Sequence, residues 1–386
     1  MGKNYQICKR CIIDTTVPGV SFDENGVCSF CKLHDKLDMM YPLDEKGKKQ
    51  QQKIIEKIKS SGKNNKYDCV VGISGGRDST YNLYLAKKKW GLRPLAVNFS
   101  DGFRNPIAAE NMKKTTRKLG VDIITVTSDW RETRDLRVAS LKASTPDIQA
   151  DADIGIATAL YGAAVKYNVK YIIIGQSFRT EGICPLEWNY LDGKYLKSIH
   201  DRFGEVKLRK WKPDDPGYNL ELKHIFYYTV IKRIRTVTPL YYENYVRSEA
   251  EKIITKELGW TDTGAHYFDD LYQSLITHFL RVKFGADRRI FNYSALVRSG
   301  QMSREEALER VKEVYVIEDP EVIDECLKRL DLTNDEFQKY MALPPKTFRD
   351  YPNNYSMLKY LKIPIKLLCS LHLLPKIAYD KYFNFA

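Results

Sequence analysis

Short apolar runs alternate with amphipathic stretches between residues 67 and 175. Four runs have the composition of buried strands, at 67–73 (YDCVVGI), 93–99 (RPLAVNF), 121–127 (VDIITVT) and 169–175 (VKYIIIG). Stretches with helical spacing lie between or beside them, at 79–91, 105–120 and 152–168, and glycines end the first two. This alternation predicts βαβ units and a parallel sheet. In such a sheet, ligands bind beyond the carboxyl ends of the strands.

The pattern changes on either side of this region. Residues 44–66 are highly charged and predict a helix that ends at Gly62, and from about residue 220 the spacing is helical with no further βαβ rhythm. We therefore expect three parts: an N-terminal module (1–40), an α/β domain (41–215) and a helical domain (216–386). The length of 386 residues is sufficient for two or three domains.

Composition adds only broad limits. Hydrophobic residues make up 43% and charged residues 29%, as in ordinary globular proteins, and the net charge is +13. The positive excess favours anionic ligands such as nucleotides, sugar nucleotides, RNA or acidic lipids. The start carries no signal-peptide pattern and no run is long enough to span a bilayer, so a cytoplasmic location is expected. The apolar, basic C-terminal tail is expected to pack on the helical domain, with weak membrane contact or partner docking as alternatives.

Four of the eight cysteines lie close together in the N-terminal module. They form the pattern C-x2-C-x16-C-x2-C, at Cys8, Cys11, Cys28 and Cys31. Two such pairs suit a closed tetrahedral zinc site, and Asn25-Gly26 between them favours a hairpin turn that brings the pairs together. Disulfides are disfavoured in the cytosol. A site closed by four thiolates leaves no open position, so we expect it to be structural.

The first predicted strand leads into a glycine-rich stretch, GISGGRDSTYN at 72–82. Gly75 and Gly76 allow the backbone to approach a phosphate, and the N-terminus of the following helix offers amide groups to it. Ser74 and Ser79 supply hydroxyls, and Asp78 can hold a Mg2+ that bridges phosphates. Neither a GxGxxG nor a GxxxxGK pattern is present. A plain turn is the alternative interpretation.

The segment SGGRDST resembles the PP-loop, SGGxDS, of the adenine-nucleotide alpha-hydrolase-like ATP pyrophosphatases. Members of that superfamily cleave ATP between its alpha and beta phosphates and adenylate a carbonyl-type oxygen. By this resemblance, the pyrophosphate would be lined by Ser74, Gly75, Gly76, Arg77, Ser79 and Thr80, with Asp78 on Mg2+. Asn98 and Phe99, at the end of the second strand, would contribute to the adenine pocket, and both suit a plain strand end equally well. Gly175, Gln176 and Arg179, in the segment IIIGQSFRTEG, would reach nucleotide or substrate, and Arg179 equally suits a solvated surface.

The segment from Gly264 to Glu309 resembles a signature block of the N-acetyl sugar amidotransferases, and the four-cysteine segment is similar to theirs. The resemblance implies an α/β fold in which a parallel-sheet PP-loop domain follows an N-terminal zinc module and precedes a C-terminal α-helical region. It implies formation of an amidino group on a nucleotide-activated acetamido sugar of bacterial surface polysaccharides, such as lipopolysaccharide O-antigen, with ATP and Mg2+. Lys283, Arg288 and Arg289 are the candidate substrate cations, with a basic helix end as the alternative. His266 is a candidate acid–base residue, although a lone histidine is more often structural.

The implied chemistry needs no cysteine nucleophile. Adenylation converts the amide oxygen into part of a leaving group, ammonia attacks the activated carbon, and AMP departs; Asp78, Ser79, Arg179 and His266 are the candidate catalytic residues. The resemblance also implies a separate glutaminase and a cyclase-like ammonia-conducting subunit, and no nucleic acid. Two alternatives remain at this point: a PP-loop enzyme that thiolates tRNA, with Cys184 as the plausible reactive thiol, and a non-catalytic zinc-bearing partner protein.

Overall fold

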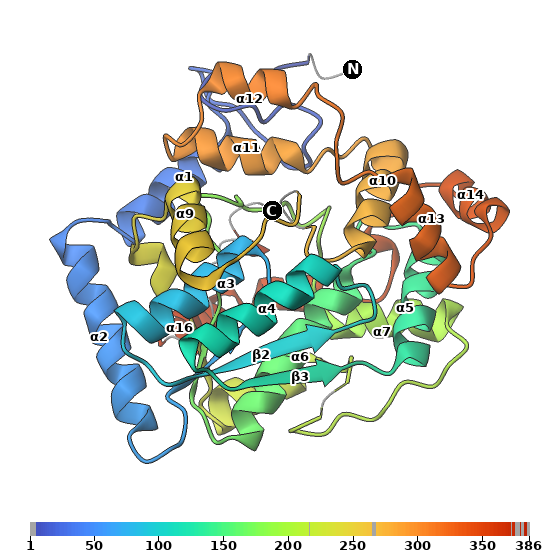
Figure 1. Ribbon diagram of the computed structural model, residues 1–386. Coiled ribbons are helices and arrows are strands. Elements are labelled where there is room, and N and C mark those ends of the chain that lie inside the picture. Colours follow the sequence, from blue (N-terminus) through green and yellow to red (C-terminus); the bar gives the residue numbers. More distant parts are fainter. Residues whose placement is uncertain are drawn as a thin grey trace.

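The centre of the protein is a five-stranded parallel sheet (Figure 1). The computed structural model describes residues 5–215, 217–264, 268–371, 373–374, 379 and 382–383. The strands lie in the order β3-β2-β1-β4-β5. Their bounds are β1 Cys69–Gly72, β2 Pro94–Ser100, β3 Ile123–Thr127, β4 Tyr171–Ile173 and β5 Arg235–Val237. The four predicted strands and the parallel pairing are therefore confirmed.

Helices cover both faces of this sheet. One face carries α2 (Glu45–Gly62), α3 (Arg77–Tyr84), α4 (Pro106–Leu119) and α9 (Arg247–Leu258). The other carries α5 (Trp130–Ala143), α6 (Ala150–Lys166), α7 (Gly193–Phe203) and α8 (Leu222–Phe226). Successive side chains of a strand point to opposite faces, so Val70 and Val71 enter different cores. Because helices cover both faces, the inner strands β1, β2 and β4 are largely apolar and buried.

The helix ends follow local signals in the sequence. The Asp44 side chain accepts backbone N–H bonds at the start of α2, and the Asn105 side chain does so at the start of α4. Pro106 occupies the first position of α4, and Gly120 ends it in the left-handed conformation (φ 59°). The predicted helix at 79–91 continues beyond α3 as a π-helical turn, Leu85–Lys89.

The sheet extends further along the chain than the sequence indicated. The expectation of no strand beyond residue 220 was wrong, because β5 pairs in parallel with β4, with Tyr171 opposite Arg235. This strand has only three residues, Arg-Thr-Val, and two are half-buried. An edge strand so short shows no apolar run, so its place in the sheet depends on its neighbour. The sheet therefore includes residues beyond 215.

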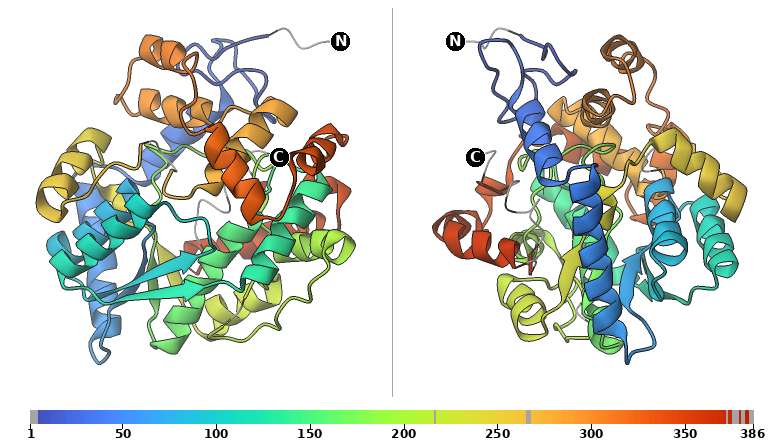
Figure 2. Two further views of the ribbon diagram at one scale, coloured as in Figure 1. Left: turned by 45° about the vertical axis from the view of Figure 1, so that its right-hand side comes forward. Right: turned by 90° about the vertical axis from the view of Figure 1, so that its left-hand side faces the viewer.

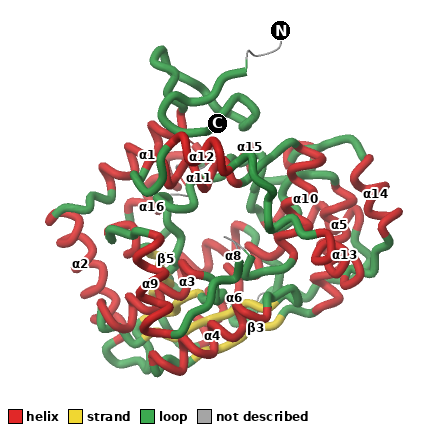
Figure 3. Tube along the Cα trace, turned by 45° about the horizontal axis from the view of Figure 1, so that its top comes forward, coloured by secondary structure: helices red, strands yellow, loops and turns green. Residues whose placement is uncertain are grey.

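The N-terminal module packs on the C-terminal helices. Its bridges and turn, including Gly26 at φ 74°, precede α1 (Ser29–Met40), and Figure 3 shows the first residues mainly as loops. Figure 1 places this module beside α11 (Arg289–Arg298) and α12 (Arg304–Arg310). The Arg304 guanidinium donates to the Cys8 and Cys11 carbonyls, and the Ile12 amide donates to Ser294 Oγ. The first and last thirds of the chain thus share one core.

The remaining helices follow the sheet domain in sequence. They are α10 (Tyr272–Phe284), α13 (Pro320–Arg329), α14 (Asn334–Ala342), α15 (Tyr355–Tyr360) and α16 (Lys362–Ser370). The views in Figure 2 show α10, α13 and α14 on the side of α5, and α15 and α16 at the margin of the molecule. Of the helices in the described ranges, none has the length and apolarity needed to cross a bilayer.

Candidate active site at the PP-loop

The loop between β1 and α3 has a fixed, open backbone. Gly75 has φ 88°, and a Cβ built there would lie 2.0 Å from the Ala108 carbonyl oxygen, so a larger residue does not fit. The Gly75 carbonyl accepts from Trp260 Nε1 at 3.0 Å and from Asn111 Nδ2 at 3.1 Å. Ser79 Oγ lies 3.0 Å from Ser74 Oγ and accepts from the Ser74 amide. These contacts hold a glycine cradle at the N-terminus of α3, which suits a phosphate.

Two residues expected to line the pyrophosphate point elsewhere. The Arg77 guanidinium is 6% exposed and pairs with Asp78, on its own loop, and with Glu251 of α9 at 2.9 Å. The Thr80 side chain is fully buried. The structure thus assigns Arg77 and Thr80 to the packing of α3 on α9 and the sheet, because the first helical turn directs both side chains inward.

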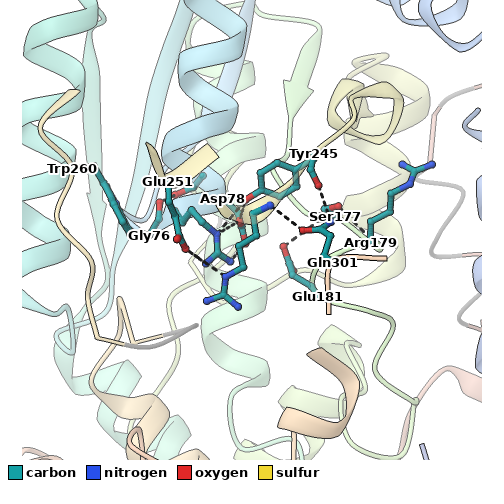
Figure 4. Close-up of polar contacts among 12 residues, drawn as sticks. Gly76, Asp78, Ser177, Arg179, Glu181, Tyr245, Glu251, Trp260 and Gln301 are labelled. Atoms are coloured by element: carbon teal, nitrogen blue, oxygen red, sulfur yellow. Dashed lines mark hydrogen bonds and ion pairs between the residues drawn. The ribbon is translucent and has the colours of Figure 1, made fainter. Parts of the chain in front are cut away.

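Asp78 is held at the junction of two parts of the chain. Its Oδ1 accepts from Arg77 Nε at 2.9 Å and from the Tyr245 hydroxyl (Figure 4). The Tyr245 carbonyl in turn accepts from Gln301 Nε2, whose side-chain oxygen accepts from the Arg247 amide. The position of the Asp78 carboxylate therefore depends on residues far beyond the sheet.

Two further carboxylates lie at this site that sequence reasoning did not assign to it. Glu181 follows β4, and its Oε1 accepts from the Ser177 amide at 3.3 Å. Asp269 precedes α10, and the backbone around it pairs with residues 103–105 after β2: the Asn105 amide donates to the Asp269 carbonyl and the Leu271 amide to that of Phe103. A Cβ at Gly76 would lie 3.1 Å from Asp269 Oδ2. The two acidic residues are visible in the sequence, in RTEG at 179–182 and DDL at 269–271. No local pattern showed that either one reaches the loop.

The electrostatics of these carboxylates reflect their crowding. Burial, together with the charges of Asp78 and Asp269, raises the pKa of Glu181 to about 8. Burial also raises the pKa of Asp269, and the negative charge of Asp78 raises it further. Oxygen donors beside a phosphate cradle fit Mg2+, and Asp78 is the residue that would hold it. Perturbed pKa values of this kind are typical of functional sites.

The end of β2 borders a cavity. Phe99 lies on its wall, and a Cβ at Gly155 would come within 2.4 Å of the Phe99 ring, so α6 packs closely there. The cavity measures about 600 Å3 and extends between β3, α6 and residues 209–218. Its size suits a small molecule. Asn98 faces the other way and accepts from Arg104 Nη2 at 2.6 Å, while Arg104 Nη1 donates to the Ser74 carbonyl.

In the segment after β4, Arg179 does not lie where the sequence led us to expect it. The Arg179 side chain donates to Asp38 Oδ1 at 2.9 Å and to the carbonyls of Tyr41 and Tyr241. Its guanidinium points away from Asp78 (Figure 4), so it anchors α1 and does not reach the loop. Gln176 is exposed, and a Cβ at Gly175 would lie 3.2 Å from the Asp78 carbonyl oxygen, which makes Gly175 a close contact with α3.

The three candidate substrate cations, Lys283, Arg288 and Arg289, have different hydrogen-bond partners. Lys283 Nζ donates to the carbonyls of Tyr340, Met341 and Leu343, near the end of α14. Arg289 pairs with Asp287 at 2.7 Å and is 8% exposed. Arg288 donates to Gln273 and, across the domains, to Gln149 at the start of α6. Arg288 is therefore the one of the three whose described bonds reach the start of a helix that packs on the sheet.

The candidate acid–base residue, His266, lies outside the described residues, so its role stays a prediction. His278 lies within α10 and pairs with Glu318 at 2.8 Å. Asp269 and Asp270 precede α10, which begins at Tyr272.

The four cysteines meet at one point, as their spacing predicted. Their sulfur atoms lie within 4.8 Å of one another, with three pairs at 3.6–3.9 Å, and all four residues are fully buried. Four ligands at Zn–S bonds of about 2.3 Å would be about 3.8 Å apart, so the set fits one tetrahedral ion. None of the eight cysteines forms a disulfide.

The comparisons with known proteins bear on the C-terminal region. Residues 241–362 match the family model described as "LPS biosynthesis protein WbpG-like, C-terminal domain". This match confirms the resemblance of that region to a family of LPS biosynthesis proteins. Tyr245, Trp260, Asp269 and Arg288 all belong to the WbpG-like region, so this region contributes directly to the edge of the sheet at which the PP-loop lies.

The other similar proteins give less information about function than the family match does. The chain is 25% identical to an uncharacterized protein of Methanocaldococcus jannaschii, MJ1599, over 331 residues, 84% of this chain and 99% of that protein. Among solved structures, the U34-tRNA thiolase NcsA of Methanococcus maripaludis is 10% identical, with a TM-score of 0.31 over 82% of this chain and 90% of that one. The NH3-dependent NAD synthetase of Campylobacter jejuni is 16% identical, with a TM-score of 0.29 over 78% and 97%. At such TM-scores neither neighbour informs the reaction.

Proposed function

We propose that the protein is an ATP-dependent amidotransferase of bacterial surface polysaccharide biosynthesis. It adenylates the acetamido oxygen of a nucleotide-linked N-acetyl sugar and substitutes ammonia, forming an acetamidino group and releasing AMP and pyrophosphate. The observation that carries this proposal is the meeting of the PP-loop with the WbpG-like region. Asp269 of that region lies against Gly76, and Tyr245 binds Asp78.

ATP would lie along the carboxyl edge of β1 and β2. The glycine cradle and the Ser74 and Ser79 hydroxyls would bind the pyrophosphate, and the cavity beside Phe99 would receive the base; the hydroxyl pair and the size of the cavity support this. Mg2+ held by Asp78 would neutralise the charge of the pyrophosphate. The chain's own contribution is to position the two reactants and to stabilise the developing charge.

The carboxylates also supply a route for a proton. When ammonia attacks the activated carbon, the bond from carbon to the adenylated oxygen breaks and AMP leaves with that electron pair. The new nitrogen must then lose a proton. Burial beside Asp78 and Asp269 raises the pKa of Glu181 to about 8, so this carboxylate can accept a proton near neutral pH.

The sugar nucleotide would enter from the side of α10 and α11. Arg288 is the candidate for its anionic groups, because its guanidinium already joins Gln273 and Gln149 across the two domains. Ammonia would come from a separate glutaminase through a cyclase-like subunit. No cysteine outside the four-cysteine cluster lies in a nucleophile-elbow context.

The alternative of tRNA thiolation is less well supported. Outside the cluster, Cys69, Cys326 and Cys369 are buried, and Cys184 alone is half-buried. A thiol relay would need a second accessible cysteine beside it.

The proposal is tested with purified protein, candidate UDP-acetamido sugars, ATP, Mg2+ and an ammonium salt. We expect AMP, pyrophosphate and a product whose mass shows replacement of oxygen by an NH group. Glutamine as the only nitrogen donor should be inactive until the two partner subunits are added. Arg288→Ala should raise KM for the sugar by about tenfold or more, whereas Lys283→Ala should leave it unchanged. Sulfur transfer to tRNA that Cys184→Ser abolishes would overturn the proposal.

A further inference from the structure

The last helices of the chain carry exposed apolar side chains at a helical spacing. Tyr360 is 89% exposed, Ile363 81% and Leu367 60%, and Leu371 is also exposed. Ile363 and Leu367 are one turn apart in α16 and therefore lie on the same face. The other face packs inward through Cys369, which is buried. Clustered exposed apolar side chains of this kind mark an interaction surface.

Basic residues flank this face. Lys359, Lys362 and Lys366 are exposed, and no carboxylate among the described residues forms an ion pair with Lys362 or Lys366. From residue 351 to residue 379 the sequence contains four lysines and neither Asp nor Glu. We name the exposed residues of this helix pair the basic apolar surface: Tyr360, Leu361, Ile363, Leu367 and Leu371, with Lys359, Lys362 and Lys366. Figure 2 (right) shows these helices, in red, at the edge of the molecule.

The charge restricts what this surface can bind. A second copy of the chain would present the same lysines, and like charges would oppose its docking. An anionic lipid surface matches both properties, because phosphate headgroups attract the lysines while the aliphatic side chains enter the boundary of the acyl chains. A nine-residue helix with this pattern lies in the plane of a membrane interface and is far too short to cross a bilayer.

We propose that the basic apolar surface docks the protein reversibly on an anionic membrane. Ile363 and Leu367 insert at the interface, and Lys362 and Lys366 bind lipid phosphates. The surface lies on α15 and α16 and uses no residue of the candidate active site. The proposal is therefore independent of the amidotransferase reaction and can fail or succeed separately from it.

The test is flotation of the full chain with vesicles. Phosphatidylcholine vesicles that contain phosphatidylglycerol should carry the protein, and vesicles of phosphatidylcholine alone should not. Raising the salt concentration should release it, because exposed charges are screened. Lys362→Glu with Lys366→Glu should weaken binding by about thirtyfold or more. Ile363→Ser with Leu367→Ser should weaken it by about tenfold or more.

A matched control separates this surface from general apolar exposure. Val314 and Val316 are 89% and 67% exposed on another segment, so Val314→Ser with Val316→Ser should leave vesicle binding unchanged. Thermal melting of every variant should match the wild type, because all of these side chains are exposed. Equal binding to both vesicle types, no binding to either, or wild-type binding by the lysine variant would overturn the proposal. Wild-type dimerisation through α16 in the absence of lipid would also overturn it.

Discussion

The four-cysteine module and the PP-loop edge are both built on short motifs, but the surrounding structure of the two differs. In the module the sulfur atoms face one another, and the Cys8 and Cys11 carbonyls are bound by Arg304. At the PP-loop, carboxylates from three distant segments lie near the glycine cradle, and burial, together with the charges of the neighbouring carboxylates, raises the pKa of Glu181 and Asp269. A closed donor set stabilises a fold, whereas an open one with perturbed pKa values is suited to chemistry.

The two regions are nevertheless connected. Arg179, on the segment that carries Glu181, binds Asp38 and the Tyr41 carbonyl at the end of α1. The buried Arg179 side chain therefore links the four-cysteine module to the segment that carries Glu181. The comparison makes the following predictions, from the largest expected effect to the smallest.

Cys28→Ser should have the largest effect, because a closed tetrahedral site loses one of four ligands. We expect loss of the bound metal and a fall in the free energy of unfolding on the order of 5 kcal/mol. Elemental analysis and thermal denaturation measure the two effects. Cys184→Ser is the control, since this residue lies outside the cluster, and it should retain about one zinc per chain. Wild-type melting of Cys28→Ser would show that the module does not depend on a metal.

Asp78→Asn should affect the reaction and leave the fold intact. The amide keeps the shape of the side chain and loses the charge, so AMP formation should fall by about 100-fold or more. The melting temperature should fall only in part, because Arg77 loses one charged partner and keeps Glu251. Steady-state assays of AMP release over a range of Mg2+ concentrations measure the effect. If Asp78→Asn turned over as fast as the wild type, Asp78 would have no role in the reaction.

Arg179→Ala tests the connection between the regions. Removal of this buried guanidinium should lower the free energy of unfolding by about 2 kcal/mol, because three acceptors lose their donor. Asp38→Ala should also destabilise, and the double variant should lose less than the sum of the two. If Arg179→Ala instead abolished turnover at unchanged stability, and Asp38→Ala had no effect, Arg179 would belong to the reaction.

Glu181→Gln should alter the pH dependence of stability. The folded-state pKa of about 8 lies above the ordinary value of 4.5, so the fold favours the protonated carboxyl. Its stabilising contribution is present below the ordinary pKa and is lost as the pH rises through about 8. The neutral variant should therefore gain stability relative to the wild type as the pH rises from about 4.5 towards 8.

Denaturant unfolding at several pH values measures this gain. Glu325→Gln is the control, because Glu325 is exposed and Arg329 holds its pKa below the usual value. It should show no such gain. A gain for Glu181→Gln that does not change with pH would mean that the carboxyl of Glu181 is not protonated preferentially in the fold.

Local patterns determined most of the architecture. Apolar runs predicted β1 to β4, glycines predicted the C-terminal ends of α2 and α4, and spacing predicted that Cys8, Cys11, Cys28 and Cys31 meet. The PP-loop was readable because its glycines, serines and aspartate act within one turn of chain. Such features depend on neighbours in sequence, so the sequence alone contains the information.

Tertiary structure decided which charged side chains belong to the site. The sequence favoured Arg179, Lys283 and Arg289 for their charge, but packing gives each of them acceptors elsewhere in the chain. It also brings Glu181 and Asp269 to the loop from segments about 100 and 190 residues away. Nothing local distinguishes a buried anchor from a ligand-binding group, since the same side chain serves either role. The difference lies in whether the fold leaves it facing its own backbone or the open edge of the sheet.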